Sequence, residues 1–177
     1  AFVNLYQERG GRATADRAIT VLQGKSVGGS TTINWTTCFR TPQRILSHWA
    51  EHHGTTLTVE EMTPHWEAIE ERLNIHRWDP AAANNNNRKL LEGCEALGFE
   101  VAPLRRNVKG CANSGYCGMG CPVNGKQSMH LTYLPDAVHA GARIFANTQA
   151  ERLVMEGRRV AAVRCSVRDE FTGRDTG

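Results

Sequence analysis

The stretch Gly24-Lys25-Ser26-Val27-Gly28-Gly29-Ser30-Thr31-Thr32-Ile33-Asn34 carries the strongest fold signal in this chain. It follows a short β-branched run, residues 19–22, and is dense in glycine and hydroxyl side chains. Adjacent glycines let the backbone approach a ligand closely and turn its N–H groups toward an anion, and hydroxyl groups add donors. The pattern therefore predicts a strand and a ligand-binding loop, although Gly-Gly-Ser also occurs in ordinary turns.

The residues around the two glycines resemble the first signature of the glucose–methanol–choline (GMC) family of flavin oxidoreductases. That signature has a glycine, a basic residue, an aliphatic residue, Gly-Gly, two small residues, and then an aliphatic residue before asparagine. An aromatic residue and a proline follow, here Phe39 and Pro42. The aromatic residue falls one position late, because Cys38 occupies its usual place.

A second stretch is similar to the middle of GMC proteins. It comprises residues 117–122, 125–128, 132–137 and 141–142 and includes Cys117-Gly118-Met119-Gly120-Cys121-Pro122. The similarity is greatest to the branch of long-chain alcohol oxidases and choline-dehydrogenase-like proteins. The resemblance covers most of residues 19–167 and is looser over 41–105.

The resemblance implies an α/β fold, present here as an α+β segment of an incomplete FAD/NAD(P)-binding GMC-type fold. Residues 1–40 would form an FAD-binding segment with the Gly-Gly-Ser loop. Residues 41–105 would form a helical lid or substrate-domain insertion. Residues 106–177 would form a cysteine-rich loop, a helix and a β-hairpin that return to the FAD-binding domain.

The cofactor implied by the resemblance is FAD. Gly28, Gly29 and Ser30 would line its pyrophosphate and flavin side, Asn34 would lie by the isoalloxazine, and Ala150 would hold the adenine position. Some relatives attach FAD through a histidine immediately before that asparagine. Ile33 stands there in this chain, so we expect FAD to bind non-covalently.

The implied activity is oxidation of an alcohol CH–OH group by hydride transfer to the flavin, with a possible separate electron acceptor. No Gly-x-Gly-x-x-Gly fingerprint precedes Gly24, and the family's catalytic histidine lies near the end of a much longer chain. We therefore expect an internal segment that is inactive alone, with the catalytic residues unknown and C-terminal to it.

Three cysteines, Cys111, Cys117 and Cys121, have the spacing C-x5-C-x3-C in a stretch that carries basic but no acidic residues. Basic surroundings favour thiolates. Unligated thiols, a disulfide, or an iron–sulfur cluster like that of some related flavin dehydrogenases all fit this pattern. The cluster would make the protein a flavin–iron–sulfur dehydrogenase.

A hypothesis from another class rests on His48-Trp49-Ala50-Glu51-His52. Two histidines at i and i+4 share a helix face and can bind zinc, with the glutamate as general base of a hydrolase. A third ligand is needed. The alternative is a solvated helix face.

Apolar spacing and capping residues predict helices over 43–53, 59–74, 85–97 and 131–140. A capping box of Thr58 and Glu61 begins the second of these. We expect strands over 99–102 and 143–146 and a hairpin of 150–156 with 159–167.

The composition limits the partners. The net charge is only +3, and 22% of the residues are charged, which argues against a nucleic-acid partner. No apolar run is long enough for a transmembrane segment. The expected partner is a small-molecule alcohol, and we expect a cytoplasmic or membrane-peripheral location.

Overall fold

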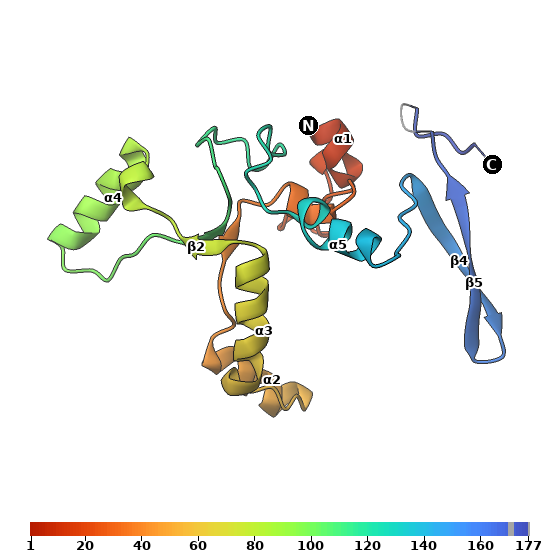
Figure 1. The fold of residues 1–177 in the computed structure, drawn as a ribbon, viewed down its shortest axis with the longest axis horizontal. Helices are drawn as coiled ribbons and strands as arrows, with labels where there is room; N and C mark the ends of the chain where they lie inside the picture. The colour runs from red at the N-terminus through yellow and green to blue at the C-terminus, as the bar shows by residue number, and fades with distance from the viewer. Residues whose placement is uncertain (170–171, 177) are drawn as a thin grey trace. The chain divides into compact units, whose positions relative to one another are not determined.

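The computed structural model describes residues 1–169 and 172–176, and they form two compact units. The first unit runs from Ala1 to Asp136, and the second begins at Ala137. Figure 1 shows the elements in chain order. The α-helices are α1 (Phe2–Leu5), α2 (Gln43–His53), α3 (Val59–Arg72), α4 (Asn85–Ala96) and α5 (Tyr133–His139). The strands are β1 (Thr37–Cys38), β2 (Ile75–Arg77), β3 (Arg105–Asn107), β4 (Thr148–Glu156) and β5 (Arg159–Val167).

The predicted helices form because their ends are capped locally. Helix α2 ends at Gly54, which adopts the left-handed conformation common after helices. At the start of α3, the Thr58 hydroxyl accepts a hydrogen bond from the Glu61 N–H, and the Glu61 carboxylate accepts one from the Thr58 N–H. The expected capping box is thus confirmed. The helices expected over 85–97 and 131–140 correspond to α4 and α5.

Three expected strands are absent from the described residues. Residues 19–22 make a single bridge, between Ala13 and Thr20, and residues 99–102 and 143–146 form no strand. Ile19 and Phe99 are largely exposed. A β-branched or apolar run becomes a strand only where a partner strand and a buried face are present, and these runs have neither.

A small antiparallel sheet joins distant parts of the first unit instead. Its order is β1-β3-β2, so the central strand β3 pairs with β1 on one side and β2 on the other. Thr37 lies opposite Arg106, and Ile75 lies opposite Asn107. The sheet therefore brings the end of the glycine-rich stretch beside the start of the cysteine-rich loop.

The interior of the first unit is small and partly polar. The buried apolar side chains are Tyr6, Ile33, Leu46, Leu73 and Val108. Several buried residues are polar or charged: Thr32, Thr36, Asn107, Lys126, Ser128 and Thr132. These residues lie mainly in the glycine-rich stretch, β3 and the segment 126–132, so the interface between these segments depends on hydrogen bonds.

The second unit consists mainly of the predicted hairpin. Strands β4 and β5 pair antiparallel from Thr148 with Val167 to Glu156 with Arg159. Gly157 and Arg158 connect them. Taken together, the described residues confirm mixed helix and strand content. None of their helices is long and apolar enough to cross a membrane.

Candidate functional site

The glycine loop, defined here as residues 24–36, is shaped by two left-handed glycines. Gly28 has φ +92° and Gly29 has φ +57°, after which Gly29–Thr32 forms a 3-10 helix. Short hydroxyl bonds close the loop: Ser26 Oγ lies 2.7 Å from Thr32 Oγ1, and Ser30 Oγ accepts from the Gly24 N–H at 3.0 Å. The hydroxyl groups of the loop thus stabilise it from within, and its role in ligand binding stays a prediction.

The loop presents one open face. No heavy atom outside its chain neighbours would lie within 4 Å of a Cβ placed on Gly29. Ser30 and Asn34 are exposed, whereas Ile33 is 2% exposed and points inward. The predicted contact residues Gly28, Gly29, Ser30 and Asn34 thus lie on one short segment, whose bare backbone at Gly29 can be approached closely by a ligand.

The buried side chain of Lys126 binds main-chain carbonyl groups of the glycine loop. The Lys126 Nζ donates to the Thr32 carbonyl at 2.7 Å and the Asn34 carbonyl at 2.9 Å. It also donates to the Cys117 carbonyl at 2.6 Å. Lys126 is 3% exposed, and this burial lowers its pKa against the opposing effect of the nearby thiols of Cys117 and Cys121. One ammonium group therefore links the glycine loop to the cysteine-rich loop.

An arginine reinforces the same junction. Arg106 Nε donates to Thr36 Oγ1 at 2.8 Å, and its guanidinium lies 4.7 Å from the ring centre of Trp78. The Thr36 N–H in turn donates to Asn34 Oδ1 at 3.3 Å, which orients the asparagine amide. Sequence reasoning gave Lys126 and Arg106 no role in this site. The only sequence signal was the position of Lys126 in the second stretch resembling GMC proteins.

Ala150 belongs to the second unit, whereas the other predicted cofactor residues belong to the first. It belongs to β4 in the second unit, opposite Cys165 of β5. The strand register shifts between Ala150 and Arg152, which is an irregularity typical of a β-bulge. The adenine role of Ala150 stays a prediction.

The three loop cysteines are free thiols that line one cavity of about 830 Å³. An Arg106 guanidinium nitrogen lies 3.5 Å from Cys117 Sγ. The Lys126 N–H lies 3.4 Å from Cys121 Sγ. Over residues 1–169 and 172–176, no three Cys, His, Asp or Glu side chains are gathered as they would be to hold a metal ion. The geometry therefore does not support the iron–sulfur cluster.

The HxxEH motif lies on α2 as expected, with all three of its polar side chains exposed. The rings of His48 and His52 lie 4.2 Å apart between centres, and His52 Nδ1 lies 3.0 Å from the His48 carbonyl. Among the described residues, no third potential metal ligand is grouped with this pair. A solvated helix face fits this geometry, and a zinc hydrolase centre does not.

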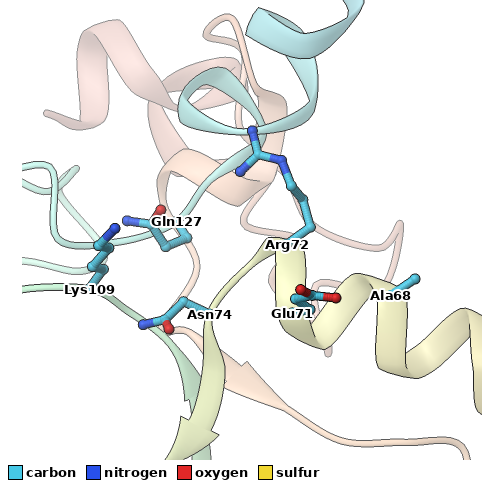
Figure 2. A pocket seen from close by; sticks show the side chains of 6 residues that line it. All are labelled: Ala68, Glu71, Arg72, Asn74, Lys109 and Gln127. Atoms are coloured by element: carbon cyan, nitrogen blue, oxygen red, sulfur yellow. The ribbon is translucent and has the colours of Figure 1, made fainter.

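A second cavity of about 480 Å³ is polar (Figure 2). Its lining residues are Ala68, Glu71, Arg72, Asn74, Lys109 and Gln127. Arg72 is bound in a bidentate pair to Asp136, at 2.6 and 2.8 Å. The Asn74 amide donates to the Val108 carbonyl at 2.6 Å. The first of these interactions connects α3 with α5, and the second connects the turn after α3 with the residue that follows β3. Sequence reasoning did not identify the cavity.

Comparison with known proteins assigns the chain to a family. The GMC oxidoreductase family model matches residues 2–176. An uncharacterized GMC-type oxidoreductase of Mycobacterium tuberculosis is 32% identical over 173 residues, which is 97% of this chain and 28% of that protein. A long-chain-alcohol oxidase of Arabidopsis thaliana is 34% identical over 154 residues, which is 86% of this chain and 20% of that protein.

A further relative, an uncharacterized GMC-type oxidoreductase of Sinorhizobium fredii, is 30% identical over 165 residues, 91% of this chain and 32% of that protein. The chain thus spans about a fifth to a third of the length of the curated relatives named here. The family match nevertheless extends over almost all of its residues. This chain belongs to the GMC oxidoreductase family.

Proposed function

We propose that this chain supplies part of a non-covalent FAD site in an enzyme that oxidises an alcohol CH–OH group. The observation that carries the proposal is the open face of the glycine loop at Gly29. Its left-handed backbone leaves room for a phosphate-bearing ligand to approach the main chain. The match of the whole chain to the GMC family supports the same cofactor.

The residues present fit such a cofactor. Ser30 Oγ accepts from the Gly24 N–H, so its own hydroxyl hydrogen can turn outward to a phosphate oxygen. Lys126 holds the carbonyls of Thr32 and Asn34 on the inner side, which keeps the outer side of the loop in a fixed shape. Preformed loops of this kind lower the ordering cost of binding. FAD, when bound, would supply the hydride acceptor for the alcohol.

Ile33 supports non-covalent attachment. It occupies the position where some GMC proteins carry the attaching histidine, and its side chain is buried instead of facing a ligand. An aliphatic side chain offers no nucleophile for a covalent bond to a flavin.

The relatives suggest the substrate class. The Arabidopsis relatives are named long-chain-alcohol oxidases, so we assign a long-chain or otherwise apolar primary alcohol to this protein. We also assign residues 41–105 to the lid or substrate-domain insertion. We propose that the base that accepts the hydroxyl proton lies outside this segment.

The test is the absorbance spectrum of the intact protein. Bands near roughly 370 and 450 nm indicate flavin, and release of the yellow chromophore on acid precipitation indicates non-covalent attachment. Addition of a long-chain primary alcohol without oxygen should bleach the longer-wavelength band. A colourless protein that takes up no added FAD would refute the proposal.

A matched pair of glycine substitutions locates the site. Gly29 and Gly98 both have positive φ, +57° and +71°, and open space where a Cβ would lie. Alanine at either position strains the backbone by about 1 kcal/mol. We expect Gly29→Ala to lose bound flavin and Gly98→Ala to retain it, at equal loss of thermal stability. Equal flavin content in both variants would mean that the loop is not the binding site.

A further inference from the structure

The cavity of about 830 Å³ holds three thiols that the proposed function does not use. Cys111, Cys117 and Cys121 all contribute to its wall. Six cysteines occur in the chain, so half of them line this one cavity. Their common cavity distinguishes them from Cys38, Cys94 and Cys165, which lie elsewhere in the fold.

The lining of this cavity combines apolar and basic side chains. Its apolar residues include two indole rings and aliphatic residues of α4 and the following segment: Trp35, Trp78, Leu90, Leu91 and Val101. The titratable or charged groups that line it are Arg106, Cys111, Tyr116, Cys117, Cys121 and Lys126. No described lining residue is acidic. The cavity thus favours a ligand with an apolar body and an electron-rich or negatively charged group.

Cys121 lies beside Lys126 in the cavity lining. Its Sγ accepts the Lys126 N–H at 3.4 Å. Burial acts to raise the pKa of this thiol, but the main-chain N–H groups of Lys126, Val123 and Gly125 and the charge of the Lys126 ammonium outweigh it, so the pKa lies below its usual range. A larger thiolate fraction makes a cysteine more nucleophilic near neutral pH.

Cys38 shows that this property is local. It lies at the sheet, where its Sγ is 3.6 Å from Asn107 Oδ1. Burial dominates there and raises the pKa of the Cys38 thiol. Two partly buried thiols of one chain therefore differ in the direction of their pKa shifts. Three main-chain N–H groups and an ammonium charge outweigh burial at Cys121, whereas the single main-chain N–H of Asn107 and the Arg105 charge do not outweigh it at Cys38.

We propose that Cys121 is a nucleophilic modification site, and that the cavity binds α,β-unsaturated carbonyl compounds with an apolar body. The Cys121 sulfur forms a C–S bond to the β-carbon, the C=C π bond breaks, and the resulting enolate takes a proton from water. No electron acceptor is needed. The apolar chain of the electrophile would lie against the apolar residues of the lining, such as Leu90, and its carbonyl would face the Arg106 guanidinium.

The test uses maleimides on the intact protein, with labelling of each cysteine read by peptide mass spectrometry. At pH 6.5 we expect N-ethylmaleimide to label Cys121 at least about threefold faster than it labels free glutathione, since the gain in thiolate is partly offset by lower intrinsic nucleophilicity. We expect N-octylmaleimide to label Cys121 at least about threefold faster still, because its chain buries apolar surface in the cavity. Its rate with glutathione should stay unchanged.

Two variants separate the thiolate from the cavity. Cys121→Ser should abolish the fast labelling phase. Leu90→Asn changes a side chain that is 65% exposed, so the fold should tolerate it, and it should remove the octyl advantage while leaving the ethyl rate intact. The proposal is overturned if Cys121 reacts no faster than glutathione, or if the octyl probe gains nothing over the ethyl probe. Neither outcome depends on FAD.

Discussion

The glycine loop and the β4–β5 hairpin can both be recognised in the sequence, but different interactions stabilise them. The glycine loop depends on contacts with residues far away in the sequence: Lys126 Nζ reaches Asn34 across 92 residues. The hairpin depends on a ladder between neighbouring strands joined by two residues. Lys126 is buried, whereas nearly every hairpin residue is exposed.

This difference predicts where single substitutions matter. A polar group that is buried must keep its partners, because an unpaired buried donor or acceptor costs about 1–3 kcal/mol. An exposed ladder residue has water as an alternative partner. The glycine loop should therefore be sensitive to changes at distant positions, and the hairpin should be sensitive mainly at its turn.

The largest expected effect is at Lys126. Lys126→Met removes the donor to three carbonyls, so we expect the free energy of unfolding to fall by about 3 kcal/mol. The measurement is urea denaturation of the intact protein, with flavin content measured in parallel. The control is Lys109→Met, an exposed lysine of the same loop, which should change stability by less than about 0.5 kcal/mol. Equal losses in both variants would contradict the assigned role of Lys126.

A second long-range interaction, between Glu70 and two arginines, is less buried than Lys126. Its loss should therefore lower the free energy of unfolding by a smaller amount. The Glu70 carboxylate, 15% exposed, accepts from Arg40 at 2.8 and 2.9 Å and from Arg105 at 2.6 Å. The Arg40 hydrogen bond, helped by Arg105 and opposed by burial, lowers the pKa of Glu70 from 4.5 to about 2. Glu70→Gln should cost about 2 kcal/mol at neutral pH, since both arginines are partly exposed and screened.

The same carboxylate gives a pH test. A group whose pKa is lower in the folded state stabilises fully above its unfolded value, so this contribution should be lost as the pH falls from about 4.5 to about 2. Thermal melts across this range should show a smaller acid loss for Glu70→Gln than for the unchanged protein. Glu67→Gln is the matched control, because Glu67 is more exposed and lies 3.9 Å from Arg40. An identical acid response in all three proteins would rule out this assignment.

The smallest effect is expected at the hairpin turn. Gly157 has φ +60° and is the first of two loop residues, the position where type II′ turns need a positive φ. Gly157→Val should cost about 1 kcal/mol, read from thermal unfolding. Arg158→Val, at the next position, should cost less than about 0.5 kcal/mol. A larger loss at Arg158 than at Gly157 would show that the turn is not what holds the hairpin.

The sequence predicted the elements whose causes are local. Helix α3 could be placed because Thr58 and Glu61 cap it and its apolar residues recur at helical spacing. The strands β1, β2 and β3 were missed because they have only two or three residues, too few to show an alternating pattern. Their existence depends on tertiary contacts that bring the three segments together, which no local pattern encodes.

The residues of the candidate site also fall into two groups, those that a local sequence pattern reveals and those that it does not. Gly28 and Gly29 could be identified because adjacent glycines among hydroxyl side chains are visible in the sequence, and both glycines adopt the positive φ that glycine favours. Lys126 could not, because lysine is usually exposed and nothing in its neighbourhood indicates a buried ammonium. The three-thiol loop was recognised, but whether it forms a metal site depends on side-chain geometry that spacing does not determine.

The hydrogen bonds of Lys126 also determine when, during synthesis, the glycine loop can reach its final shape. A chain emerges from the ribosome at roughly 5–20 residues per second. The 92 residues between Asn34 and Lys126 therefore take about 5 to 20 seconds to follow the glycine loop into solution. During this interval the loop has its glycines and hydroxyls but lacks the ammonium that fixes its inner side. The glycine loop is synthesised before Lys126, and it reaches its final shape only after the segment that carries Lys126 has been made.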